Sequence, residues 1–407
     1  MKELENLTES AGYTVVATVE QVRKAYPRFQ IGRGKVKELA RLVKEHNARK
    51  IIFDNRLKSV QAYNLAKETG VEAIDRFQLI LEIFTQRAST TEAKLQIQLA
   101  KLRYESAHAK EKVRLARMEE QPGFMGLGAY EVDVYHEAVQ RQVHTIQKKL
   151  KQFKRKRGLH RKRRLDLGFS AISLGGYTYA GKSTLFNALV HEAVPTGEGL
   201  FTTLSTTTRL VNLLGKRVLL TDTVGFIDRL PLTLIEAFRS TLEETIFSDL
   251  ILLIVDASEP LKEIKRKHSI SLDVMQKIGV HGIPVVTALN KIDLLSEYEI
   301  QQRTDALKDL ASNIVPISAL HDINISLLEQ ELVKHLANYI HATFSIPLSD
   351  ETLSFLSWIF NYADVKNVKY EDDYANVSFE AVADFADKVL GRVKQYGGTV
   401  KEFVELK

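Results

Sequence analysis

The sequence predicts a multidomain α/β protein in which a long helical hairpin separates two of its α/β domains, and three observations support this. First, 407 residues exceed the usual size of one compact domain, and this length favours roughly two to four domains. Second, short apolar runs alternate with helical spacing in segments 1–88, 167–342 and 343–407, which is typical of α/β domains. Third, segment 89–166 contains two stretches free of glycine and proline with heptad-like apolar spacing, which predicts paired helices.

Composition and charge exclude several classes of protein. Hydrophobic residues make up 44% and charged residues 27% of the chain, which is typical of folded proteins and excludes disorder as the main description. We expect a cytoplasmic monomer without a membrane span, because the sequence lacks both a long apolar run and the apolar core of a signal peptide. The absence of cysteine excludes disulfides and thiolate metal sites. A net charge of +6 is compatible with an anionic partner such as RNA.

The first domain, 1–88, reads as alternating strands and helices. We expect strands over 13–19, 50–53 and 71–74, and helices over 35–46, over 59–68 and from 76 onward, because apolar spacing switches between these segments. The glycine-containing turn 31–35 precedes a helix and is able to cradle an anion. A plain turn is the favoured interpretation, so we assign no chemistry to it.

Two long helices are predicted next, over 89–118 and 131–153. Their apolar positions follow steps of three and four residues. These positions are Leu95, Leu99, Leu102, Ala109 and Val113 in the first helix and Val139, Val143, Ile146, Leu150 and Phe153 in the second. The helices should therefore pack as an antiparallel hairpin around the turn 121–128. Phe124, Met125 and Leu127 near this turn either fold back onto the hairpin or contact a partner, and both interpretations remain open.

A dense basic run follows the hairpin seam. It comprises Lys148, Lys149, Lys151, Lys154, Arg155, Lys156, Arg157, Arg161, Lys162, Arg163 and Arg164. Such a run is either a solvated helix face or a contact for a phosphate backbone. Few aromatic residues accompany it, which argues against stacking on single-stranded bases. Electrostatic attachment to nucleic acid is the preferred interpretation.

A phosphate-binding loop is predicted after the apolar strand 169–174 and before a helix over 185–189. Its residues are Gly176, Tyr177, Thr178, Tyr179, Ala180, Gly181, Lys182, Ser183 and Thr184. They match the pattern GxxxxGK[ST] between a strand and a helix, as this motif requires. Backbone N–H groups of such a loop surround a phosphate, Lys182 neutralises its charge, and Ser183 is placed to bind Mg²⁺.

Two further segments complete the expected phosphate and metal site. An apolar strand from 217 ends at Asp222, which is placed to hold Mg²⁺, and the Gly225 N–H is placed to sense a γ-phosphate. The segment also contains Thr223 and Val224. Between the two motifs lie Phe201, Thr202, Thr203, Leu204 and Ser205. Among these, we select Thr203 as the switch threonine that closes on Mg²⁺.

The base is predicted to be guanine. Asn290, Lys291, Ile292 and Asp293 follow the expected strand 283–289. The Asp293 carboxylate is able to accept two hydrogen bonds from the guanine edge, and adenine offers no such pair of donors. After the expected strand 314–317 come Ser318, Ala319 and Leu320, which supply a backbone N–H for the guanine carbonyl.

These motifs in this order predict a Ras-like P-loop GTPase domain over 167–342 that hydrolyses GTP to GDP. We expect Lys182, Thr203 and Gly225 to act in catalysis, and Ser183, Thr203 and Asp222 to bind Mg²⁺. Phe226 follows Gly225 where many Ras-like proteins have a water-orienting glutamine. Hydrolysis therefore needs another element to accelerate it.

A helix over 327–339 should finish this domain, and a small α/β domain, 343–407, should follow. In the latter we expect strands over 365–370 and 374–379 and a helix over 382–396, with Trp358 in the core. No catalytic group is predicted there.

The chain resembles the HflX family of translational GTPases. The resemblance lies in Gly176–Thr178 with 180–187, in 200–204 and 220–227, and in the earlier segments 32–35, 52–55, 79–84 and 92–96. It implies the four-part architecture given above and binding of GTP and GDP with Mg²⁺. It also implies association with the ribosome, chiefly its large subunit and ribosomal RNA, in subunit separation or rescue. Where the family usually has asparagine, this chain has Tyr179.

Three alternatives remain open at this stage. The protein is a GTP-regulated binding module with very slow hydrolysis, a GTPase acting on RNA other than the assembled ribosome, or an RNA-remodelling NTPase that uses its N-terminal domain. A metabolic kinase is disfavoured, because no second substrate pocket is predicted.

Overall fold

The computed structural model describes residues 2–119, 127–190, 207–223, 225–226, 246–336 and 339–406, and it leaves undescribed the side chains of 107–119, 127–136, 160–166 and 406. The described chain divides into two compact units, 2–153 and 154–406. Each unit is considered by itself. None of the helices in the described ranges is long and apolar enough to cross a membrane.

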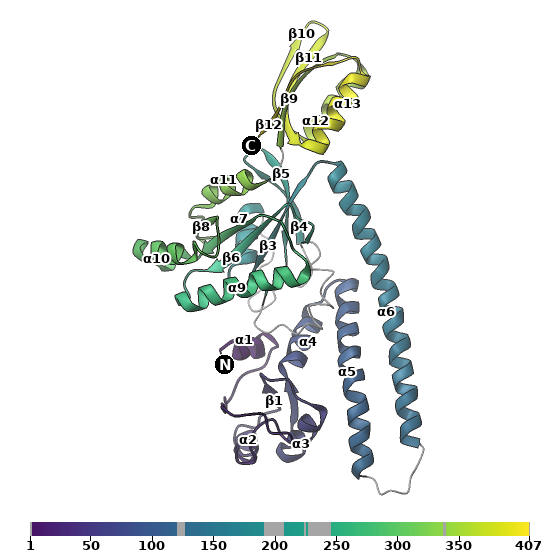
Figure 1. The fold of residues 1–407 in the computed structure, drawn as a ribbon, viewed down its shortest axis with the longest axis vertical. Helices are drawn as coiled ribbons and strands as arrows, with labels where there is room; N and C mark the ends of the chain where they lie inside the picture. Colours follow the sequence, from purple (N-terminus) through teal and green to yellow (C-terminus); the bar gives the residue numbers. More distant parts are fainter. Residues whose placement is uncertain are drawn as a thin grey trace. The chain divides into compact units, whose positions relative to one another are not determined.

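The first unit opens with a small α/β domain (Figure 1). Its elements are α1 (Lys2–Ser10), α2 (Arg33–Glu45), β1 (Lys50–Phe53), α3 (Ser59–Thr69), β2 (Glu72–Asp75) and α4 (Arg76–Arg87). Strands β1 and β2 pair in parallel, and α3 ends at Gly70 in the left-handed conformation, which glycine adopts without strain. The helices and strands expected from residue 35 onward are confirmed.

The expected strand over 13–19 is wrong. This segment has no strand assignment, and the Val16 side chain is 49% exposed. Tyr13 instead donates a hydrogen bond through its hydroxyl to Glu82 of α4 at 2.9 Å. A β-branched run favours a strand only when a neighbouring strand pairs with it and its side chains pack, and neither condition holds here.

The turn before α2 is a structural turn. The Gly32 N–H donates to the Gln21 side chain at 2.9 Å, so this donor is already used within the protein. A Cβ on Gly32 would lie 2.4 Å from the Arg23 guanidinium. That guanidinium is the end of a flexible, exposed side chain and can shift, so the bond to Gln21 defines this turn rather than a lack of space.

Helices α5 (Thr91–Glu119) and α6 (Leu127–Asp166) follow and run in opposite directions (Figure 1). Val139 and Ile146 of α6 are buried, and Val143, Leu150 and Phe153 are partly buried between exposed neighbours, which confirms the predicted apolar face of this helix. The start of α5 is buried more widely than predicted, because it also packs on α3 and α4. Residues 120–126, which contain most of the predicted turn with Phe124 and Met125, lie outside the described residues.

The second unit contains a six-stranded sheet in the order β4-β5-β3-β6-β7-β8, where β4 is antiparallel and the others are parallel. Its strands are β3 (Ser170–Gly176), β4 (Thr207–Leu213), β5 (Lys216–Asp222), β6 (Leu250–Asp256), β7 (Val285–Asn290) and β8 (Ile314–Pro316). Its helices are α7 (Lys182–Val190), α9 (Leu261–Ile278), η1 (Ile292–Leu294), α10 (Glu297–Leu307) and α11 (Ile325–His335). Apolar residues of α7 and α11 share one core with the strands. This arrangement is the Ras-like fold that the motifs predict.

The last domain has the order β9 (Tyr339–Pro347), α12 (Asp350–Tyr362), β10 (Asp364–Glu371), β11 (Tyr374–Val382), α13 (Ala383–Gln395) and β12 (Thr399–Leu406). Its antiparallel sheet has the order β10-β11-β9-β12, which is the split βαβ arrangement of ferredoxin-like domains. Trp358 packs against the Phe385 ring at 4.8 Å, as expected for a core residue.

The helix predicted over 327–339 is too long. α11 ends at His335, and β9 begins at Tyr339, inside the range that the sequence assigns to the GTPase domain. Tyr339 pairs with Val382 and Leu406 in the final sheet, so pairing between distant strands overrides the local helical spacing. The same tyrosine contacts Ser170 of β3 through their hydroxyl oxygens at 3.3 Å.

Candidate nucleotide-binding site

The phosphate loop connects the end of β3 to the start of α7, and sterics explain its two glycines. Gly176 has a φ of +142°, and a Cβ there would lie 2.3 Å from the Ile254 carbonyl oxygen. Gly181 has a φ of +93°, and its Cβ would lie 2.3 Å from the Asn290 side-chain nitrogen. A larger residue would collide with the backbone of β6 at Gly176 and with the buried Asn290 side chain at Gly181, and both positive φ values favour glycine. The loop is therefore held close to both β6 and β7.

Lys182 is the first residue of α7 and is almost fully buried. Its Nζ donates to the Tyr177 carbonyl oxygen at 2.8 Å, so the side chain folds back over the loop. Burial lowers the pKa of Lys182 to about 8, although the Asp222 carboxylate opposes this effect. An anion bound in the loop would stabilise the protonated form. The loop therefore holds a buried ammonium group whose charge a bound phosphate would compensate.

Ser183 and Asp222 lie together beside the loop. The Ser183 hydroxyl donates to Asp222 Oδ2 at 3.1 Å, and the Asp222 side chain is buried at the end of β5. The next residue, Thr223, donates through its hydroxyl to the Leu174 carbonyl oxygen at 2.5 Å and ties β5 to β3. The described residues contain no group of three or more His, Asp or Glu side chains able to hold a metal ion. One hydroxyl and one carboxylate are nevertheless a set suited to Mg²⁺, which takes its remaining ligands from phosphates and water.

The segment after Asp222 is bonded to the phosphate loop through its backbone. The Phe226 N–H donates to the Gly176 carbonyl and the Thr178 N–H donates to the Phe226 carbonyl, both at 2.9 Å. A Cβ on Gly225 would lie 2.8 Å from Lys182 Nζ. The Phe226 ring is 2% exposed and carries no polar atom. This position therefore offers no side-chain group that could orient water, as the sequence predicts.

The guanine motif lies at the end of β7, and its side chains form hydrogen bonds with the neighbouring loops. Asn290 donates to the Ala180 carbonyl at 2.8 Å and accepts from the Ala319 N–H at 2.9 Å. Lys291 lies in the left-handed region with a φ of +69°, and its Nζ contacts Asp256 Oδ2 at 2.5 Å. These bonds bring together the phosphate loop, the end of β6 and the segment that contains Ser318 and Leu320.

Asp293, the predicted acceptor for guanine, lies in η1 near the exposed side chain of His321. Its Oδ2 is 3.8 Å from His321 Nε2. The Leu320 side chain is 71% exposed, whereas the Ser318 side chain is fully buried. Sequence reasoning missed His321 and Asp256. The acidic end of the apolar run 250–255 was a signal for Asp256, but nothing in the local sequence marks His321.

Some predicted site residues are not placed by the structure. Phe201, Thr202, Thr203, Leu204, Ser205 and Val224 lie outside the described residues. Tyr179 is described, with a φ of +65° and a side chain 49% exposed. Asparagine tolerates this backbone region better than other side chains that carry a Cβ.

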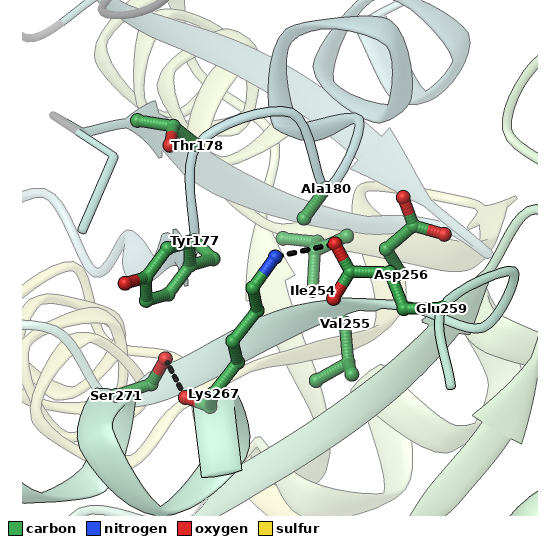
Figure 2. Close-up of a pocket in the computed structure, with 9 residues that line it drawn as sticks. All are labelled: Tyr177, Thr178, Ala180, Ile254, Val255, Asp256, Glu259, Lys267 and Ser271. Atoms are coloured by element: carbon green, nitrogen blue, oxygen red, sulfur yellow. Dashed lines mark hydrogen bonds and ion pairs between the residues drawn. The ribbon is translucent and has the colours of Figure 1, made fainter. Parts of the chain in front are cut away.

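A small pocket adjoins the first half of the phosphate loop (Figure 2). The loop, the end of β6 and one face of α9 supply its lining, which consists of Tyr177, Thr178, Ala180, Ile254, Val255, Asp256, Glu259, Lys267 and Ser271. Sequence reasoning assigned no role to the residues of α9, because their helical spacing is that of any amphipathic helix.

Comparison with known proteins matches three successive family models. Residues 1–85 match the GTP-binding GTPase N-terminal model, 87–164 the GTP-binding GTPase middle region, and 171–291 the 50S ribosome-binding GTPase model.

Relatives and solved structures match across most of the chain. GTPase HflX of Methanocaldococcus jannaschii is 40% identical over 96% of this chain and 95% of the relative. GTPase HflX of Thermococcus kodakarensis is 42% identical over 98% and 91%, respectively. A crystal structure of SsGBP in complex with GDP is 26% identical, covers 82% of this chain and 94% of that chain, and has a TM-score of 0.51.

Proposed function

Because the chain belongs to the HflX family of GTPases and is a GTP hydrolase, we propose that it binds the large ribosomal subunit. We propose further that GTP hydrolysis there drives subunit splitting or rescue. Support for a ribosomal partner comes from the match of 171–291 to a ribosome-binding GTPase model. The described basic side chains of α6 provide the second support.

The contact that we propose with ribosomal RNA is the basic face of α6. Lys148, Lys149, Lys151, Lys154, Arg155 and Lys156 are all exposed on this helix. Exposed lysine and arginine side chains bind phosphate backbones mainly by releasing counterions. The side chains of Arg161, Lys162, Arg163 and Arg164 lie outside the described ones and remain a prediction.

Within the nucleotide site, we propose that Lys182 moves from the Tyr177 carbonyl to the β- and γ-phosphates. Ser183 and Asp222 would hold Mg²⁺, which supplies positive charge for the phosphates when bound. Asp293 would accept from the guanine edge, with Asn290 fixing the surrounding loops. Thr203 and Gly225 keep their predicted roles in closing on Mg²⁺ and sensing the γ-phosphate. The loop residues 176–184 and 318–320 would contribute backbone contacts.

Acceleration of hydrolysis is assigned to the ribosome. The buried, apolar Phe226 side chain leaves the free protein without a water-orienting group at this position. We propose that the ribosome contacts residues 201–205 and the segment after Gly225 and that these contacts supply the missing group. We therefore expect slow intrinsic hydrolysis and fast hydrolysis on ribosomes.

Sedimentation with ribosomal subunits tests this function. The full chain should sediment with large subunits in the presence of a non-hydrolysable GTP analogue and much less with GDP. Neutralising Lys149, Lys154 and Arg155 should weaken binding and reduce its salt dependence by about one unit of slope per lost phosphate contact. An equal number of exposed lysines replaced on α9 and α2 serves as the control. Equal binding of free RNA and subunits would instead favour a GTPase acting on other RNA.

A further inference from the structure

The loop residue Tyr177 occupies an unusual position, because three of its groups are held by different parts of the domain. Its carbonyl accepts from Lys182 Nζ at 2.8 Å. Its backbone forms a parallel bridge with Phe226. Its ring is 5% exposed and lies in the pocket described above. The ring and the carbonyl that accepts from the phosphate-binding lysine thus belong to one residue that is held at three points.

The ring is contacted by a lysine from outside the recognised motifs. Lys267 of α9 places its Nζ 4.8 Å from the centroid of the Tyr177 ring, within the range of a cation–π interaction. The same ammonium forms an ion pair with Glu259, which follows β6. Figure 2 shows the Lys267 side chain rising beside the ring toward the Glu259 carboxylate.

Several features make this arrangement more rigid than an ordinary surface ion pair. The Lys267 and Glu259 side chains are only 21% and 28% exposed, so water screens the pair weakly. The Lys267 carbonyl also accepts from the Ser271 hydroxyl at 2.8 Å. The second oxygen of Glu259 is buried, without a hydrogen-bond partner among the described residues. The carboxylate is thus committed to Lys267.

We propose that Lys267, oriented by Glu259, is a positioning residue for the phosphate loop of this GTPase. It holds the Tyr177 ring, and through the Tyr177 backbone it fixes the first turn of the loop in the shape that receives the phosphates. It contacts neither nucleotide nor Mg²⁺. Its removal therefore weakens nucleotide binding by loosening the loop and leaves the chemistry of bound GTP unchanged.

The test compares the full-length protein with the variant Lys267→Met, which keeps the aliphatic stem and loses the charge. A fluorescent guanine nucleotide gives the dissociation constant and dissociation rate for GDP and GTP, and single-turnover assays give the hydrolysis rate of bound GTP. We expect affinity for both nucleotides to fall roughly three- to tenfold, as for loss of one partly buried cation–π contact. The single-turnover rate should stay within about twofold, and Lys267→Arg should restore affinity, because a guanidinium also pairs with carboxylates and stacks on rings.

Two further variants keep the result interpretable. Lys265→Met removes an exposed lysine from the same helix and should leave affinity unchanged. In a Tyr177→Leu background, Lys267→Met should add no further loss, because the ring through which it acts is gone. The proposal is overturned if arginine fails to restore affinity, if Lys265→Met has the same effect, or if the two losses simply add. It is also overturned if hydrolysis slows while affinity is retained.

Discussion

Asn290 and Ala180 are joined by a hydrogen bond of 2.8 Å from the asparagine side chain to the alanine carbonyl. This bond links the guanine motif at the end of β7 directly to the phosphate loop. The Asn290 oxygen simultaneously accepts from the Ala319 N–H, and the whole side chain is buried. One amide therefore holds three loops in register.

We predict that Asn290→Ala weakens both GTP and GDP binding by more than tenfold and also lowers the melting temperature of the nucleotide-free protein. Removing the amide leaves a buried carbonyl and a buried N–H without partners, which costs about 1–3 kcal/mol each. Calorimetric binding and thermal unfolding would measure the two effects. An intact melting temperature together with lost affinity would show that Asn290 acts on the base alone and does not brace the loops.

A second prediction concerns base selection. Asp293→Asn should reduce GTP affinity and shift preference toward xanthosine triphosphate, because the carboxamide can donate to the carbonyl that replaces the exocyclic amino group. Competition binding with both nucleotides measures the ratio. His321→Ala is the matched control, since His321 is the exposed neighbour of this carboxylate. An unchanged preference in Asp293→Asn would remove Asp293 from the base site.

We predict that the buried charge of Lys182 lowers the free energy of unfolding of the nucleotide-free protein. Its pKa falls from 10.5 to about 8 on burial, so between these two pH values the unfolded state binds the proton and the folded state does not. Stability must therefore rise with pH across this window, and the cost is fully present below about pH 8. At pH 7 we expect Lys182→Met to raise the free energy of unfolding by up to about 3 kcal/mol.

The same variant should bind GTP far more weakly, because the phosphate charge loses its buried partner. Denaturant unfolding of the wild-type protein and Lys182→Met at pH 7, 8 and 10 tests the stability effect. A wild-type stability that stays flat or falls between pH 8 and 10, relative to the variant, would contradict the assigned pKa shift.

The final domain should depend on a buried ion pair. Lys216, at the start of β5, pairs with Glu380 of β11 and lies 4.2 Å from the centre of the Tyr339 ring. Lys216→Met removes this partner but leaves Glu380 with Lys366 at 3.6 Å, so it should destabilise the protein by less than the roughly 3 kcal/mol expected for a buried charge that loses its only partner. The double variant Lys216→Met with Glu380→Gln should recover part of that loss. Equal stability of the single and double variants in thermal unfolding would show that the pair is not coupled.

The Tyr179 position should control the response to potassium. An asparagine at this position of the loop would offer a carboxamide oxygen to a potassium ion near the phosphates, where positive charge stabilises the transition state. Tyr179→Asn should therefore gain a preference for potassium over sodium in intrinsic hydrolysis. Asparagine also suits the positive φ at this position, so the variant should fold at least as well. Wild-type hydrolysis with a strong potassium preference would contradict this account.

The order of motifs along the chain was enough to predict a Ras-like domain, a guanine nucleotide and the family. Each motif is a short local pattern whose chemistry follows from residue type and spacing. Gly176 and Gly181 have positive φ values, which glycine adopts more readily than other residues. The helical hairpin was likewise predictable, because heptad spacing depends on neighbours three and four residues away.

Contacts between distant segments could only be read from the tertiary structure. The expected strand over 13–19 is absent because its side chains lack a strand partner, and the helix over 327–339 stops early because Tyr339 pairs with β11 and β12. Three contacts join residues that are far apart in sequence. They are the hydrogen bond from Asn290 to Ala180, the ion pair Lys216–Glu380 and the contact of Lys267 with the Tyr177 ring. No local pattern encodes such neighbours, since they arise when strands and helices pack and bring their ends together.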